Sequence, residues 1–176
     1  MLFLQIMYQR LLLITLAAFL YIGCNEEKPG RNLDNDTRTG REITPTHVLQ
    51  IFSEDRERTI AEVKVALAQT ESERNIGLMD VHDMPFDTGM YFIFETETHR
   101  SFWMANTPLS LDILFISSDY RIVRIHTNTT PFSERQIRSE LPAKFTLEVN
   151  AGFVREFDIR EGMHVNLEPF NETGNR

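Results

Sequence analysis

Residues 101–116 read SFWMANTPLSLDILFI, and this stretch contains two apolar runs separated by a polar step at Thr107-Pro108. Proline fixes its own φ angle and lacks a backbone N–H, so a Thr-Pro step between two apolar runs predicts a turn. Both runs are short and rich in aromatic or β-branched residues, which is typical of strands. The stretch therefore predicts two consecutive strands, at residues 101–106 and 109–117.

Alternating hydrophobicity continues on both sides of this stretch. In TIAEVKVALA (59–68), the apolar residues Val63, Val65 and Leu67 fall on one face of an extended chain, whereas charged residues fall on the other. Further strands are predicted at residues 47–52, 89–95, 121–127, 144–150 and 163–169, and a loop is predicted at residues 130–142. The chain is therefore expected to be mostly β.

Two short helices are expected to interrupt the strands. Thr70 and Glu73 have the spacing of a capping box, which predicts a helix over residues 71–79. A second short helix is predicted over residues 151–159. About seven strands and two short helices predict a mostly β (α+β) domain, folded as a compact antiparallel barrel or sandwich, because both architectures protect the edges of a sheet.

The N-terminus has a different composition. Residues 11–22, LLLITLAAFLYI, form an apolar run after Arg10 that is too short to span the ~30 Å hydrocarbon layer but suits the core of an export signal. The following Gly23-Cys24 resembles a bacterial lipoprotein signal, in which a small residue precedes the cysteine that receives the lipid. We expect a signal peptide over residues 1–23 and lipidation of Cys24, the single cysteine. A plain signal peptide or a short apolar anchor is the alternative, and the start of translation, at Met1 or Met7, is left open.

The segment after Cys24 is polar. Residues 24–46 are expected to be a flexible tether, because they contain too few large apolar residues to offset the loss of chain entropy on folding. A β-rich domain at residues 47–170 and a polar tail at residues 171–176 complete the organisation. The net charge is −8, and it becomes −9 without the signal, which disfavours nucleic acid and anionic lipid head groups as partners. We therefore expect an exported protein, lipid-anchored to a bacterial membrane and facing the periplasm or the exterior.

Motifs that mark a catalytic or metal site are absent from the sequence. It contains no nucleophile elbow, phosphate loop, dinucleotide fingerprint or helical zinc-binding pair. The five histidines are scattered, and Asp80, His82 and Asp83 are interpreted as a solvated turn, because a metal site needs three or four converging ligands. The sequence predicts no metal and no cofactor.

Two acidic residues, Asp112 and Glu148, interrupt apolar strands. If their carboxyl groups met in one cleft, they could act as an acid and base pair in hydrolysis. The other interpretation is that each carboxylate is a hydrogen-bonded anchor for neighbouring backbone or for an arginine, or, for Glu148, that it simply faces water. Arg74, on the predicted helix, is the expected cationic partner of a carboxylate.

Trp103, the only tryptophan, lies close to Asn106 and Asp112 in the sequence. An aromatic ring beside an amide and a carboxylate is typical of pockets that bind sugars, peptides or small polar ligands. The competing interpretation places Trp103 in the core, with its indole N–H bonded to a carbonyl. Arg74, Trp103, Asn106 and Asp112 are therefore the predicted ligand-binding residues.

Five blocks of the sequence resemble a known family. They are ESERNIGLMD (71–80), DTGMYFIFE (87–95), SFWMANTPLSLDILFI (101–116), KFTLEVNAGF (144–153) and EGMHV (161–165). Together they resemble the domain-of-unknown-function family number 192, also called uncharacterised protein family 0127, over about residues 60–168. The resemblance implies a compact β-rich domain and a bacterial or archaeal, often exported, protein. It assigns no activity, and Ala105 and Ser110 depart from the residues common in the family.

The sequence thus favours a lipid-anchored, non-catalytic binding or accessory module of the cell envelope. Its expected partners are the membrane, through the lipid, and a small polar ligand, glycan or peptide. The alternative is an envelope hydrolase that uses Asp112 and Glu148, and a third hypothesis is a structural role in envelope assembly. Whether the chain is an enzyme is left open at this level.

Overall fold

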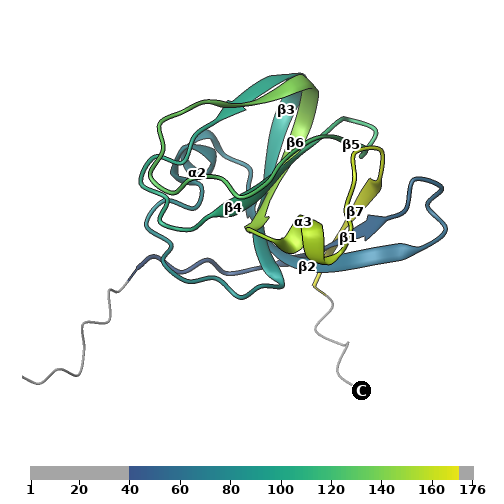
Figure 1. Cartoon of the computed structure of the whole chain (residues 1–176), viewed down its shortest axis with the longest axis horizontal. Helices are drawn as coiled ribbons and strands as arrows, with labels where there is room; N and C mark the ends of the chain where they lie inside the picture. Colours follow the sequence, from purple (N-terminus) through teal and green to yellow (C-terminus); the bar gives the residue numbers. More distant parts are fainter. Residues whose placement is uncertain (1–39, 171–176) are drawn as a thin grey trace, which may run out of the picture. The chain divides into compact units, whose positions relative to one another are not determined.

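The computed structural model describes residues 40–170, which form a seven-stranded sheet with two short helices (Figure 1). The strands are β1 (His47–Phe52), β2 (Thr59–Ala68), β3 (Thr88–Phe102), β4 (Leu111–Ile116), β5 (Ile122–His126), β6 (Ile137–Asn150) and β7 (His164–Pro169), and the helices are α2 (Glu71–Ile76) and α3 (Phe153–Glu156). The expected signal peptide, Cys24, most of the expected tether and the polar tail lie outside the described residues.

The order of strands in the sheet is β5-β4-β6-β3-β2-β1-β7. All neighbouring pairs are antiparallel except β2 and β3, which are parallel. Parallel neighbours need a long crossover connection, and residues 69–87, which include α2, provide it. The sheet therefore differs from the all-antiparallel arrangement that the sequence predicts at this one pairing.

The sheet curls so that its two edge strands meet at one end. Arg121, just before β5, forms an isolated antiparallel bridge with His164 of β7. Two backbone hydrogen bonds support this contact: Ile122 N–H donates to the Met163 carbonyl at 2.8 Å, and Val165 N–H donates to the Tyr120 carbonyl at 2.9 Å. The result is a half-barrel in which part of each edge is paired, which agrees with the predicted fold class.

The two faces of the sheet have separate hydrophobic cores. Side chains alternate between the faces along each strand, so Leu114 and Leu147 belong to one cluster, and Ile113 and Phe115 belong to the other. The first cluster also contains Phe153 of α3. The second includes Leu78, after α2, and Met104, after β3. Because both faces are covered, β4 is buried at all six of its positions.

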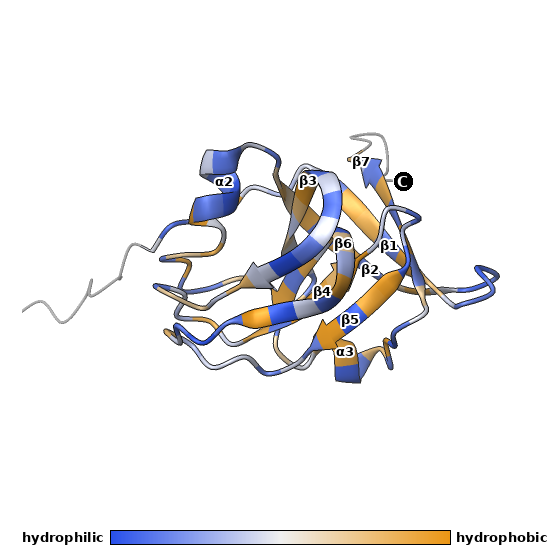
Figure 2. Cartoon of the chain, turned by 90° about the horizontal axis from the view of Figure 1, so that it is seen from above, coloured by the Kyte–Doolittle hydropathy of each residue, from blue (hydrophilic) through white to orange (hydrophobic). Residues whose placement is uncertain are grey.

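Helix α2 begins at the predicted capping box. The Thr70 hydroxyl accepts the Glu73 N–H at 3.2 Å, and the Glu73 carboxylate accepts the Thr70 N–H at 2.8 Å. The helix has no buried residue and is mostly hydrophilic, whereas the strands mix hydrophobic and hydrophilic segments (Figure 2). It ends earlier than predicted, at Gly77, whose φ of 49° takes the chain out of the helix.

Strands β3 and β6 are both longer than predicted. Residues 88–102 form one strand where two were expected, and the expected loop at residues 130–142 contains the start of β6. These two strands pair along most of their lengths, with register shifts between Ile93 and Thr98 and between His99 and Ser101. Such irregularities break the alternation of apolar and polar residues. A prediction based on alternation therefore ends a strand where the register shifts, although the strand continues.

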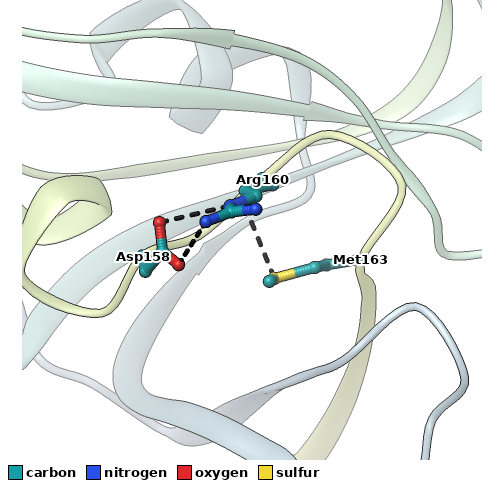
Figure 3. A network of polar contacts seen from close by, with 3 residues as sticks. All are labelled: Asp158, Arg160 and Met163. Carbon is teal, nitrogen blue, oxygen red and sulfur yellow. Dashed lines mark hydrogen bonds and ion pairs between the residues drawn. The ribbon is translucent and has the colours of Figure 1, made fainter.

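A short polar network stabilises the turn between α3 and β7 (Figure 3). The Arg160 guanidinium donates to both carboxylate oxygens of Asp158, at 3.2 and 2.6 Å, and the Arg160 backbone N–H lies 3.5 Å from the Met163 sulfur. This turn leads into the region where β5 and β7 meet.

Candidate ligand pocket

A pocket of about 370 Å³ lies between the end of α2, strand β3 and the residues that follow β3. Its lining residues are Arg74, Asn75, Ile76, Gly77, Leu78, Met79, Phe92, Phe94, Ser101, Phe102, Trp103, Thr107 and Glu148. Two of the four predicted ligand-binding residues, Arg74 and Trp103, are in this set. The pocket thus combines the helix with the face of the sheet that carries Glu148.

Glu148 is the deepest ionisable group of the pocket. It lies on β6 between Met90 of β3 and Ile113 of β4, and its side chain is only 4% exposed. Burial raises the pKa of its carboxyl from 4.5 to about 8, because removal from water penalises the charged form. Within residues 40–170, no hydrogen bond or ion pair reaches this carboxyl group from another side chain or from the backbone. At neutral pH it is therefore mostly a neutral acid that can donate a hydrogen bond.

Four aromatic side chains, Phe92, Phe94, Phe102 and Trp103, form the wall of the pocket. Phe102 packs edge-on against Phe92 and Phe94, with ring centroids 5.1 and 6.3 Å apart, so this part of the wall is held by packing. Trp103 is 56% exposed and lies outside the core, against the second of the two sequence interpretations. The wall is apolar, and the exposed Trp103 at its outer end is accessible to a ligand.

Arg74 lies at the last turn of α2, next to the aromatic wall. Its guanidinium donates to the Ile93 carbonyl at 3.0 Å and also to the Gln69 carbonyl, and it stacks over the Phe94 ring at 5.1 Å. These contacts fix the side chain against the rim of the pocket. Arg74 and Glu148 are the two ionisable side chains among the lining residues.

The structure places Asp112 and Asn106 outside this lining. Asp112 is fully buried, and its carboxylate accepts three backbone N–H groups, from Asn128 at 2.9 Å and from Gly152 and Val154 at 3.0 Å. It is a hydrogen-bonded anchor that ties β4 to the start of α3. Asn106 is exposed and adopts a φ of 54° in the turn, where its carbonyl accepts the Asp80 N–H.

The predicted pairing of Asp112 with Glu148 is wrong. In the β4–β6 register, Asp112 is opposite Val149, and Glu148 is opposite Ile113. Residues opposite each other share a face, and consecutive residues point to opposite faces, so the two carboxyl groups lie on opposite sides of the sheet. They cannot act together in one cleft. The expectation that Glu148 faces water is also wrong, because the second core covers its face.

Comparison with known proteins places the chain in a family. The family model of DUF192, described as "Uncharacterized ACR", matches residues 52–167. The chain belongs to the DUF192 family. The match extends from the last residue of β1 to the middle of β7, so it contains every residue that lines the pocket.

Two solved structures share the fold of this DUF192 domain. One, from Sinorhizobium meliloti 1021, is described as a candidate transcription regulator; it has 36% sequence identity and a TM-score of 0.66, and the match covers 72% of this chain and 97% of that one. The other is a protein of unknown function from Novosphingobium aromaticivorans DSM 12444, with 28% identity, a TM-score of 0.63 and coverage of 68% and 83%. No curated protein matches the chain significantly.

Two further features of the DUF192 domain bear on its chemistry. In residues 40–170, no three His, Cys, Asp or Glu side chains are grouped so that they could hold a metal ion. Over the same range, none of the helices has the length and apolar character needed to cross a membrane.

The sequence did not reveal that Glu148 and the phenylalanines share a pocket in this DUF192 domain. Alternation along residues 144–150 places Glu148 on one face of the strand and Leu147 and Val149 on the other. The pattern is the same whether the face that carries Glu148 is covered by water or by protein. The covering comes from residues about 45 to 75 positions earlier in the chain, around Leu78 and Phe102. A Glu in the middle of an otherwise apolar strand was the available signal.

Proposed function

We propose that this chain is a lipid-anchored, non-catalytic binding module of the bacterial cell envelope, and that it holds a small polar ligand in the pocket beside Glu148. One observation carries the binding function: a buried carboxyl group that no other group of residues 40–170 hydrogen-bonds lines a pocket with an aromatic wall. Burying a polar group without a hydrogen bond costs a few kcal/mol, so such a group usually serves a function. A ligand that pairs with Glu148 would recover this cost.

The form of the pocket supports binding. Its volume is within the range of small-molecule sites, and it is lined by aromatic side chains with a few polar groups, as such sites commonly are. Arg74 and Glu148 provide two different polar contacts across the apolar wall. The position of Asp112 on the other face leaves the pocket without a second carboxyl group, which favours binding over acid and base hydrolysis.

The location in the envelope is supported by the sequence. The apolar run at residues 11–22 followed by Gly23-Cys24 resembles a lipoprotein signal. Several acyl chains on Cys24, each buried methylene contributing ~0.8 kcal/mol, would hold the protein on a membrane without a spanning helix. The β-rich domain would then face the periplasm or the exterior.

The description of the Sinorhizobium structure suggests nucleic acid as an alternative partner. A protein that binds DNA gains most of its affinity from Lys and Arg contacts to phosphates. The present chain has 18 basic and 26 acidic residues. This balance favours a small ligand over a nucleic acid.

Binding can be tested with the single tryptophan as a reporter. Trp103 lines the pocket and is the only tryptophan, so its indole N–H gives one NMR signal of known position. Thermal-shift assays of the soluble domain with envelope glycans, short peptides and metabolites should yield at least one stabilising compound that also moves this signal. The proposal fails if stabilising compounds leave the Trp103 signal unchanged, or if the protein is recovered from membranes in a stable complex that covers the pocket.

The anchor is tested separately by changing Cys24 to Ser in the full chain. We expect the wild-type protein in the membrane fraction, with a mass increase from acyl groups on the N-terminal peptide. The Cys24→Ser variant should lose both properties. Lipid-free wild-type protein would contradict the anchor and leave the pocket untouched.

A further inference from the structure

Two arginines lie against the ring of Phe94; Arg74 is itself a lining residue of the pocket, whereas Arg100 reaches it only through this ring. The guanidinium of Arg74 is 5.1 Å from the centroid of Phe94, and that of Arg100 is 3.8 Å from it. Arg100 is held in place by hydrogen bonds from its guanidinium to the Ala143 carbonyl, at 3.1 Å, and to the Thr96 carbonyl. Phe94 itself lines the pocket. Two positive charges are therefore fixed beside one pocket wall.

Neither arginine has an acidic partner within residues 40–170. The ion pairs found there join Lys64 to Asp87, Arg124 to Glu161, and Arg160 to Asp158. Partial burial and the neighbouring charge of Arg74 lower the pKa of Arg100. In a chain with a net charge of −8, two guanidinium groups on one ring, neither paired with a carboxylate of residues 40–170, are a local positive site.

We infer that the pocket binds an organic carboxylate, whose anionic group pairs with Arg74 and Arg100 and whose apolar body lies along the aromatic wall toward Glu148. This inference rests on the proposed binding function of the same pocket. The planar guanidinium is well suited to a carboxylate because it offers two parallel N–H donors. The aromatic wall adds contact area for a planar or aliphatic body.

Glu148 sets a second requirement on the ligand. As a neutral acid in the pocket, it can donate a hydrogen bond to a carbonyl or hydroxyl oxygen of the bound molecule. An ammonium ligand is disfavoured, because it would approach two guanidinium groups. The chemical class is therefore a carboxylate and not an amine, and an oxygen acceptor on its apolar body would also pair with Glu148.

The inference can be tested with three fluorinated probes of similar size and different charge. These are 4-fluorobenzoate, 4-fluorobenzamide and 4-fluorobenzylamine, titrated near pH 6.5 and followed by ¹⁹F NMR, with the Trp103 indole signal as the marker of position. We expect the benzoate to bind about tenfold more tightly than the benzamide, as for a charge-assisted contact, and the amine to bind most weakly. Equal affinities, or tightest binding of the amine, would overturn the inference while leaving a binding pocket in place. The carboxylate inference also fails if none of the three probes moves the Trp103 signal. This holds even if screening finds other ligands for the pocket.

Variants identify the groups involved. Arg74→Gln and Arg100→Gln should each remove most of the preference for benzoate over benzamide, whereas Arg155→Gln, on an exposed position of α3, should not. Both arginines also donate to backbone carbonyls, so the two variants are compared and each is required to remain folded. A preference for benzoate that survives in both variants would overturn the assignment of the site.

The pH dependence of binding tests the contact with Glu148. In the wild-type protein, benzoate affinity should fall between pH 6.5 and 9, because ionisation of Glu148 places a second negative charge beside the ligand. Arg74 is the other ionisable residue that lines the pocket. Glu148→Gln, which keeps the size and a hydrogen-bond donor, should bind with little change across the same range. The same fall in both proteins would overturn the placement of the ligand beside Glu148.

Discussion

Asp112 and Glu148 occupy neighbouring strands one register position apart, yet their carboxyl groups lie on opposite faces of the sheet. Asp112 is satisfied by three backbone N–H groups at the start of α3. Glu148 lines the aromatic pocket, and its carboxyl group has no hydrogen-bond partner within residues 40–170. Two acidic residues with similar sequence surroundings therefore have different roles, one in stability and one in the candidate ligand site.

Asp112→Asn should destabilise the domain strongly. The amide keeps the shape of the side chain, but its NH₂ group cannot accept the N–H groups that one carboxylate oxygen accepts, so a buried donor is left facing another donor. We expect a loss on the order of 3 kcal/mol in the free energy of unfolding, measured by urea denaturation. Asp158→Asn, at an exposed turn position, should change it by less than about 1 kcal/mol. Similar small effects of both changes would contradict the anchoring role of Asp112.

Glu148 should make the stability of the domain decrease with pH. Its pKa is about 8 in the folded state and near 4.5 when exposed, so between these values the folded protein holds a proton that the unfolded chain releases. The contribution of Glu148 to the free energy of unfolding should therefore fall between pH 5 and 8, by up to about 1.4 kcal/mol per pH unit. Glu148→Gln has no such proton to lose, and its stability relative to the wild type should rise over this window.

The measurement is a series of urea denaturation curves at pH 5, 6.5 and 8 on both proteins. The exposed Glu156 provides a control, because Glu156→Gln should leave the pH dependence unchanged. A constant difference between Glu148→Gln and wild type at all three pH values would show that Glu148 does not take up a proton on folding.

Trp103→Ala should weaken ligand binding with little effect on folding. The side chain is 56% exposed, so its removal leaves no large cavity, and the free energy of unfolding should change by less than about 1 kcal/mol. Any ligand that moves the Trp103 indole signal in the wild type should bind at least several-fold more weakly to the variant, as measured by calorimetry. Phe132→Ala, at a similarly exposed residue outside the pocket, is the matched control. Unchanged affinity in folded Trp103→Ala would remove Trp103 from the site.

Gly89→Ala should disturb the sheet next to Glu148. A Cβ atom at Gly89 would contact the Glu148 carbonyl oxygen too closely and would lie 2.9 Å from a Val149 methyl group. Because these atoms belong to the paired strand β6, relief requires a shift of the backbone, and we expect a loss of about 2–4 kcal/mol in the free energy of unfolding. A change below about 1 kcal/mol would show that β3 and β6 can separate at this point without cost.

Local signals in the sequence predicted several elements correctly. The capping box predicted the start of α2, and the alternation in residues 59–68 predicted β2 with its observed bounds. The resemblance to DUF192 agrees with the family match and with the β-rich fold. Each of these signals lies within a few residues, or within a motif block, and so does not depend on packing between distant segments.

Other features depended on contacts that the sequence pattern does not contain. Strand β3 continues past the polar residues 95–97 because its pairing with β6 resumes at Thr98 after a register shift, and part of the predicted loop at residues 130–142 belongs to β6. The pairing of β6 with both β3 and β4 places Glu148 between Met90 and Ile113, in a pocket that the end of α2 also lines. A position's burial depends on what covers each face of the sheet, and this is set by distant segments.

The sequence by itself thus determined the mostly β class, the capping of α2 and the family, because periodicity and capping act between residues close in the chain. Only the tertiary structure decided that Asp112 is an anchor, that Glu148 lines a pocket, and that Arg74 and Arg100 lie on one ring. These properties arise from strand register and from the packing of the residues around Leu78 against the sheet, where residues far apart in the chain exclude water from one another.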